Sequence, residues 1–153
     1  MLRIKLTLIL VTILILVSSC SQVKSSPQPL PSPSTKWTVK LDQSGGIAGV
    51  HLTAQISSDG QLIAEDQRSH RSVTQTLSSQ TLTRLNQLIT NTWSAKSPTQ
   101  SGCADCFIYD LEIQSEESDV QIHVDDVTMK DSGAAELIAF VNKLRDDALR
   151  PNP

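Results

Sequence analysis

Two cysteines three positions apart are the residues of this sequence best suited to redox or metal chemistry. Cys103 and Cys106 stand in the sequence CADC, and a pair at this spacing can form a disulfide, work as a redox couple or supply two metal ligands. In thioredoxin-like redox motifs the pair lies between a strand and the start of a helix, whereas this pair precedes a pattern typical of a strand. A zinc site would need two more ligands at suitable spacing. We therefore expect a local structural disulfide, and reactive thiols and a metal site are the alternatives.

A glycine-rich stretch, SGGIAG, spans Ser44–Gly49 and contains three glycines. A phosphate-binding loop would lead into a helix, whose N-terminal amides face the anion, but this stretch leads into an alternating strand pattern. The glycines therefore predict a turn, because glycine adopts positive φ at no steric cost. Ile47 and Ala48 stand at its tip, where a solvent-facing turn normally carries polar residues, and this indicates a contact surface. A plain hairpin loop without a partner is the alternative.

Three histidines and two pairs of neighbouring aspartates are the remaining candidates for catalysis or metal binding. His51, His70 and His123 show no spacing typical of metal ligands. Asp125–Asp126 cannot aim both carboxylates at one site, because neighbours in a strand point to opposite faces, and Asp146–Asp147 lies on the polar side of a helix. No serine stands in a G-x-S-x-G nucleophile elbow. We therefore predict a protein that is not an enzyme and that uses no cofactor, metal or small-molecule substrate.

Periodic patterns of apolar residues define the elements that must position these side chains. Strict alternation predicts half-buried antiparallel strands, and helical spacing predicts two helices, the first capped by Ser78 and the second ended by Pro151. The order βββαββα indicates an α+β domain, with an antiparallel sheet of about four to five strands and two helices packed on one face. The predicted strands span 36–42, 50–57, 61–66, 104–114 and 120–124, and the last helix spans 132–149.

Residues 1–19 have the pattern of a signal peptide. Arg3 and Lys5 form a basic start, and the apolar run that follows suits a signal and is short for a membrane span. The sequence VSSC, ending at Cys20, resembles a bacterial lipobox, in which the cysteine becomes the lipid-bearing first residue of the mature protein. We predict attachment through Cys20 to the cell membrane or outer membrane of a bacterium, with the domain on the extracytoplasmic side. A plain secretory signal and an uncleaved anchor are the alternatives.

Residues 20–34 are predicted to form a tether, and residues 35–150 a single domain. The alternate prolines of the tether favour polyproline II and offer little to bury in a core. The chain has 13 basic and 16 acidic residues, and two of the basic ones lie in the signal, so the mature protein carries a formal charge of −5. An acidic domain with few aromatic residues binds nucleic acid poorly, so we expect no nucleic-acid partner.

The glycine-rich stretch and the patterns around it resemble one known family. VKLDQSGGIAGV, from Val39 to Val50, is similar to the opening hairpin of emfourin-type proteins, in which a strand is followed by SGG, an apolar residue, AG and a second strand. LSSQTLTRLNQLI, a serine-led amphipathic helix, and DCFIYDLEI, with an acidic residue before an alternating strand, fit the layout of the same family. The resemblance covers residues 35–149. The matching residues of the glycine motif are Ser44, Gly45, Gly46, Ala48 and Gly49, with Ile47 at the apolar position.

The resemblance implies a small α+β protein that inhibits thermolysin-like zinc metalloproteases. Such inhibitors have no cofactor of their own, and the zinc belongs to the protease. Residues 44–49 would then bind the protease, with Ile47 as an apolar anchor in its concave cleft. The lipobox, the proline tether and the CADC loop depart from the family pattern and leave the target open. We expect a membrane-anchored inhibitor. A non-inhibitory lipoprotein binding module and a thiol redox protein that uses Cys103 and Cys106 are the alternatives.

Overall fold

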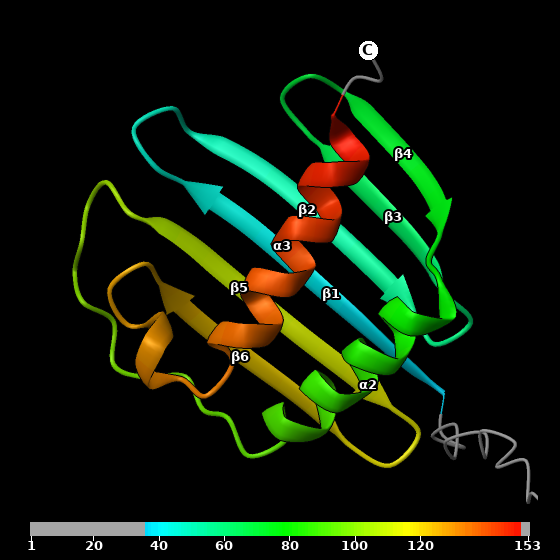
Figure 1. Cartoon of the computed structure of the whole chain (residues 1–153). Helices are drawn as coiled ribbons and strands as arrows, with labels where there is room; N and C mark the ends of the chain where they lie inside the picture. The colour runs from blue at the N-terminus through cyan, green and yellow to red at the C-terminus, as the bar shows by residue number, and fades with distance from the viewer. Residues whose placement is uncertain (1–35, 151–153) are drawn as a thin grey trace, which may run out of the picture. The chain divides into compact units, whose positions relative to one another are not determined.

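The computed structural model describes residues 36–150, so the predicted signal peptide, Cys20 and the tether lie outside the described residues. The described part contains one antiparallel sheet of six strands in the order β4-β3-β2-β1-β5-β6 (Figure 1). The elements are β1 (Trp37–Gly45), β2 (Val50–Ser57), β3 (Gln61–Asp66), β4 (Arg71–Thr76), α2 (Ser79–Thr92), β5 (Phe107–Ser115), β6 (Asp119–Asp125), the 3-10 helix η1 (Met129–Asp131) and α3 (Ala135–Leu149).

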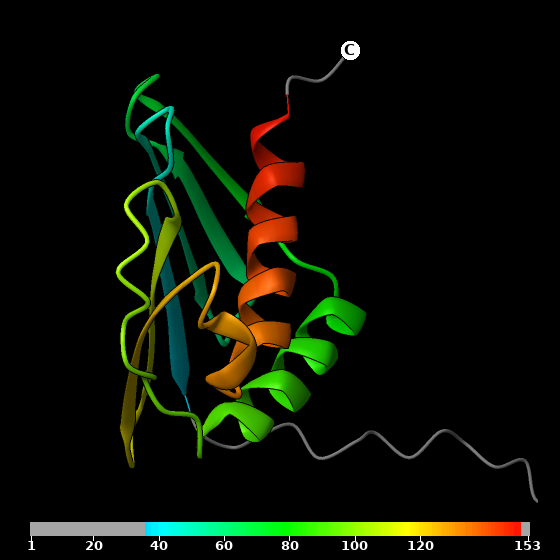
Figure 2. The ribbon, with the colours of Figure 1, turned by 90° about the vertical axis from the view of Figure 1, so that its left-hand side faces the viewer.

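Both α-helices lie on the same face of the sheet (Figure 2). α3 contacts β1, β2, β3 and β4, and α2 packs beside α3. The opposite face of the sheet, called the open face below, carries no helix from residues 36–150. The arrangement confirms the predicted α+β class with two helices on one face. Neither α-helix in this part of the chain has the length and apolar content needed to cross a membrane.

The core lies between the sheet and the two helices, and β1 runs through its centre. β1 pairs antiparallel with β2 on one side and with β5 on the other. Trp37, Val39 and Leu41 point toward the helices and are buried, whereas Lys40 and Asp42 point to the open face. The predicted alternation and helical stripes supply the rest of the core, which includes Ala54, Ile56, Leu62, Leu85, Leu88, Leu111, Ile113, Ile122, Val124, Leu137, Ile138 and Val141.

The structure has one strand more than the sequence analysis predicted. β4 follows β3 through the turn at 67–70 and pairs with it antiparallel from Asp66↔Arg71 to Gln61↔Thr76. Its sequence, RSVTQT, shows little alternation of apolar and polar residues, because β4 forms an edge of the sheet and most of its side chains are exposed. The sheet therefore has six strands instead of four to five, and the order becomes ββββαββα.

Three predicted element ends move by three residues in the structure. β1 continues past residue 42 to Gly45, because its polar last residues still pair with β2 and β5. β5 begins at Phe107 rather than at 104, because the Cys103–Cys106 disulfide holds the preceding residues in a loop. α3 begins at Ala135 rather than at 132, because the chain first makes the 3-10 turn of η1, to which the Ser132 hydroxyl bonds.

The predicted cap of the first helix is confirmed. Ser78 has an extended backbone, with φ −69° and ψ 155°, and its Oγ accepts a hydrogen bond from the N–H of Thr81 at 3.2 Å. This bond satisfies one of the amides that the first turn of a helix leaves without an intrahelical partner. Leu77, directly before the cap, is buried in the core. The two residues together fix the point at which the chain turns from β4 into α2.

We expect Ser78→Ala to lower the free energy of unfolding by about 1 kcal/mol, because the amide of Thr81 loses its acceptor. Ser79→Ala is the matched control, since Ser79 is exposed in the same turn but its hydroxyl caps no amide; we expect a change within about 0.5 kcal/mol there. Chemical denaturation of both variants measures the difference. Equal losses from the two substitutions would contradict the capping role.

Candidate functional site

Four connections gather at one end of the sheet. The turn at 46–49 joins β1 to β2, and the turn at 67–70 joins β3 to β4 beside it. The antiparallel register aligns Gly45 with Phe107 and Ile108 with Asp125, so the start of β5 and the end of β6 lie at the same end (Figure 1). We call residues 44–49, 67–70, 101–107 and 125–128 the loop end.

The glycines at the β1–β2 turn occupy backbone positions that other residues would strain. Gly45, Gly46 and Gly49 have φ of +87°, +68° and +58°, in the left-handed region that favours glycine. A Cβ on Gly45 would lie 2.8 Å from the carbonyl oxygen of Cys106, and one on Gly46 would collide with the ring of Phe107. The first two glycines therefore allow the start of β5 to approach the turn.

The two large apolar side chains with the greatest exposure among residues 36–150 both belong to the loop end. Ile47, at the tip of the β1–β2 turn, is 92% exposed, and Val127, just after β6, is 51% exposed. Phe107 lies on the strand between the two connections, is half-buried and packs against Gly46. Exposed apolar side chains that gather on one part of the surface indicate a contact site. The sequence analysis found Ile47 and missed Val127.

Neighbouring segments hold the tip from both sides. The N–H of Gly46 donates to the carbonyl of Cys106 at 3.0 Å, and the N–H of Gly49 donates across the turn to the carbonyl of Gly46 at 2.9 Å. On the other side, the guanidinium of Arg68 donates to the carbonyl of Ala48. The tip is therefore bonded to β5 and to the β3–β4 turn as well as to its own strands.

The CADC motif forms the disulfide that the sequence analysis predicted. The Cα atoms of Cys103 and Cys106 are 5.6 Å apart and the two sulfurs are bonded. With both sulfurs joined, neither cysteine is a thiolate ligand for a metal. Within the described part of the chain, no group of three or more His, Cys, Asp and Glu side chains is placed to hold a metal ion. The disulfide closes a short loop within the loop end, and this loop lies beside the β1–β2 turn.

The two neighbouring aspartates at the end of β6 hold the loop end together. The carboxylate of Asp125 accepts from the hydroxyl of Ser101 at 2.7 Å and from the hydroxyl of Thr128 at 2.9 Å. These donors, Ser101 first, hold the pKa of Asp125 well below its usual range. Asp126 accepts instead from the N–H of Phe107 at 2.8 Å. The pair is thus directed to different partners, as the sequence analysis expected.

A buried polar chain connects the loop end to α3. Arg145 is 2% exposed, and its Nη2 donates to Oε1 of Gln43 at 2.6 Å and to Oδ1 of Asp146 at 2.8 Å. Nε2 of Gln43 lies 3.5 Å from the hydroxyl of Tyr109, which donates to Oδ1 of Asp126 at 3.1 Å. Burial, together with Asp126, raises the pKa of Tyr109 to about 12, so this hydroxyl remains a donor.

The sequence analysis did not predict this series of buried hydrogen bonds, although the positions of two polar residues indicate it. Arg145 stands four residues after Val141 and seven after Ile138, so it falls on the apolar stripe of α3. Gln43 likewise continues the alternation of Val39 and Leu41 on the buried side of β1. Charged and amide side chains at core positions indicate that each has a buried partner.

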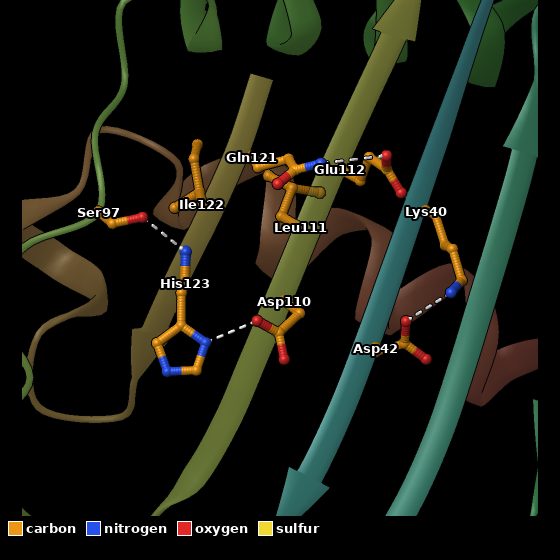
Figure 3. A pocket seen from close by; sticks show the side chains of 9 residues that line it. All are labelled: Lys40, Asp42, Ser97, Asp110, Leu111, Glu112, Gln121, Ile122 and His123. Atoms are coloured by element: carbon orange, nitrogen blue, oxygen red, sulfur yellow. Dashed lines mark hydrogen bonds and ion pairs between the residues drawn. The ribbon is translucent and has the colours of Figure 1, made fainter. Parts of the chain in front are cut away.

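The open face of the sheet has a shallow hollow of about 440 Å³ over β1, β5 and β6 (Figure 3). Several of its polar groups contact each other: Nδ1 of His123 lies 2.6 Å from Oδ1 of Asp110, and Nζ of Lys40 lies 2.9 Å from Oδ2 of Asp42. The hydrogen bond to Asp42 raises the pKa of Lys40. This hollow presents paired side chains rather than a nucleophile with its base. His51 and His123 both lie on this polar face of the sheet.

The loop end is therefore the strongest candidate site in the described part of the chain. It combines exposed apolar side chains with backbone that is fixed by hydrogen bonds, glycines and a disulfide. Such a surface can enter a cleft. Comparison with protein-family models finds none that matches the chain, and comparison with curated proteins finds no related sequence.

We expect the double variant Cys103→Ser, Cys106→Ser to lose about 1–3 kcal/mol of unfolding free energy, because the disulfide closes only a short loop. The sheet and core should persist, since neither cysteine belongs to the core. Denaturation curves and far-UV circular dichroism of the oxidised protein and the double variant measure this. Complete unfolding of the double variant would show that the disulfide supports more than its own loop.

Proposed function

We propose that this protein is a membrane-anchored inhibitor of a thermolysin-like zinc metalloprotease and that the tip of the β1–β2 turn blocks the active-site cleft. The observation that carries the proposal is Ile47, which is 92% exposed at the tip of a turn that is bonded on both sides. The side chain of Ile47 is exposed to water in the free protein. Its burial in an apolar pocket of a partner can contribute several kcal/mol of binding free energy. The resemblance of SGGIAG to the glycine motif of emfourin-type inhibitors directs the proposal to this class of protease.

The rigidity of the tip favours tight binding. Association costs free energy whenever a loop must be ordered on binding, so a loop that is already ordered binds more tightly. The bond from Gly46 to Cys106 and the bond from Arg68 to Ala48 order the tip before any partner arrives. Because the glycines lack side chains, only Ile47 and Ala48 project from the turn, and this narrow tip fits a concave cleft.

An inhibitor of this kind must also resist cleavage, and the conformation of the tip favours such resistance. A peptide substrate held along a cleft by strand addition would be extended. Here the N–H of Gly49 bonds to the carbonyl of Gly46, and both glycines have positive φ, so residues 46–49 form a closed turn. The peptide bonds of the tip are therefore presented in a geometry that differs from that of a substrate.

The anchoring part of the proposal rests on Cys20 and the lipobox, outside the described residues. Residues 21–35 separate Cys20 from the described domain, and the domain begins at Lys36 and Trp37, where β1 starts. The tip lies at the other end of β1, roughly 30 Å away at the usual rise of a strand. A lipid at Cys20 would thus hold the domain at the membrane by the end of β1 that lies away from the tip.

Inhibition by the domain 34–153, which contains every core residue, tests the proposal directly. We expect the domain to inhibit at least one enzyme of a panel of thermolysin-like proteases. Ile47→Asp should raise the inhibition constant roughly a hundredfold, because a charge would be desolvated in the cleft at a cost of about 3 kcal/mol. At an exposed tip the same change should alter stability by no more than about 0.5 kcal/mol. Thermal melts measured beside the inhibition curves check this.

Two further variants distinguish the contribution of the tip to inhibition from that of the rest of the loop end. Val127→Asp adds the same charge elsewhere on the loop end and should weaken inhibition much less than Ile47→Asp does. Gly46→Val should lower both stability and inhibition, because its side chain collides with Phe107. Full inhibition by folded Ile47→Asp would remove the tip from the mechanism. No inhibition by the unsubstituted domain across the panel would favour the non-inhibitory binding module.

Acylation of Cys20 is tested separately in the full chain. Expressed in a bacterial host, the chain should partition into the membrane fraction, and its mature N-terminal peptide should begin with a lipid-modified Cys20. Cys20→Ser should leave the chain unprocessed or release it from the membrane. A soluble mature protein that begins at another residue would contradict the anchor and would leave the inhibitor proposal standing.

A further inference from the structure

We propose that the outer edge of β4 is a self-association site, at which β4 pairs antiparallel with β4 of a second copy of this chain around a two-fold axis at Thr74. β4 is one of the two edge strands of the sheet. Four observations support the proposal: the direction of its backbone groups, the lack of cover from residues 36–150 of the kind seen on the other edge, the absence of charge in residues 72–76, and its self-complementary register. The loop end is not involved.

The hydrogen-bond pattern shows which groups of β4 point outward. In an antiparallel pair, alternate residues bond to the neighbouring strand and the residues between them point away from it. The N–H of Leu77 donates to the carbonyl of Gly60, and this bond continues the register of β4 with β3. Residues 71, 73 and 75 therefore bond to β3, and the N–H and C=O groups of Ser72, Thr74 and Thr76 point outward. No hydrogen bond from residues 36–150 to these outward groups is present.

Residues 36–150 protect the opposite edge of the sheet in a way that they do not protect β4. The outward N–H of His123 on β6 donates to the Ser97 hydroxyl at 2.8 Å, and that of Asp125 donates to the Thr128 hydroxyl at 3.1 Å. Ser97 belongs to the connection between α2 and β5, which therefore runs along β6. Sheets commonly protect their edges with such cover, with charges, with proline or with bulges. Residues 72–76, with the sequence SVTQT, contain no charge and no proline, and their pairing with β3 has no bulge.

The sequence of β4 suits pairing with itself. A two-fold axis at Thr74 places Thr74 opposite Thr74 of the second copy and Ser72 opposite Thr76, so every outward residue meets an outward residue. Three such pairs, each exchanging two hydrogen bonds, follow from this register. Thr–Thr and Ser–Thr pairs across strands are favourable. The nearest charge on the strand, Arg71, would lie opposite Leu77 rather than opposite a second arginine, and Arg71 already donates to the carbonyl of Arg150.

The size of this contact predicts weak association. Stable interfaces bury roughly 1,200–2,000 Å², which is more than two short edge strands supply, so the dimer should depend strongly on concentration. Confinement of both copies to one membrane would raise their effective concentration. A two-fold axis perpendicular to the sheet is compatible with such confinement, since it can lie along the membrane normal and relate the two chains equally to the lipid surface.

Cysteine cross-linking of the full chain tests both the contact and its register. In hydrogen-bonded antiparallel pairs the Cα atoms are about 5.5 Å apart, a distance that a disulfide spans. Under mild oxidation, Thr74→Cys should therefore form a covalent dimer. Ser72→Cys is the matched control: it is exposed on the same strand and face, but its predicted neighbour is Thr76, so it should give several times less dimer. The double variant Ser72→Cys, Thr76→Cys should cross-link as well as Thr74→Cys.

Sedimentation of the unsubstituted chain and of Thr74→Lys provides the second measurement. The unsubstituted chain should show a concentration-dependent monomer–dimer equilibrium, and Thr74→Lys should abolish it, because two ammonium groups would face each other across the axis. Equal cross-linking of Thr74→Cys and Ser72→Cys, self-cross-linking of Ser72→Cys alone, or a dimer that survives Thr74→Lys would each overturn the proposal. A chain that stays monomeric at every concentration would also overturn it.

Discussion

The pairing of β1 on both of its edges is the constraint on which the rest of this structure depends. β1 bonds to β2 and to β5, and its buried side chains, Val39 and Leu41, lie at the centre of the core. Because β2 follows β1 directly while β5 comes after α2, this double pairing joins the two halves of the chain into one sheet. The helices then have one continuous apolar face on which to pack. A shift of β1 by one residue would turn its core residues toward the open face.

The same pairing places the start of β5 against the glycine turn. Gly45 pairs with Phe107, and side chains are excluded at Gly45 by the carbonyl oxygen of Cys106 and at Gly46 by the ring of Phe107. The disulfide fixes the loop that carries this carbonyl, and the buried chain from Arg145 through Gln43 and Tyr109 to Asp126 ties the neighbouring connection to α3. The conformation of the tip is therefore fixed by residues that are distant from it in sequence. Its shape before binding is the property on which the proposed inhibition rests.

The molecule offers two surfaces that differ in physical character. The loop end exposes apolar side chains on fixed backbone, which suits insertion into a concave partner. The edge of β4 exposes backbone groups and short hydroxyl side chains, which suits the addition of a strand. The open face carries the ion pair of Lys40 with Asp42 and the hydrogen-bonding contact of His123 with Asp110. Partly exposed pairs of this kind contribute little free energy.

Much of the fold could be predicted from the sequence, because periodicity records which face of an element is buried. Alternation determined β1, β2 and the α+β class, and the turn signal at Asp59–Gly60 indicated β3. Helical spacing with Ser78 determined α2, and the spacing of Cys103 and Cys106 favoured the disulfide that forms. Periodicity does not indicate which element packs against which. An edge strand whose side chains are mostly exposed also shows little periodicity. The tertiary structure alone therefore decided the sixth strand, the exposure of Val127 beside Ile47, and the buried contact of Arg145 with Gln43 across 102 residues. Each depends on which surfaces meet when the chain folds.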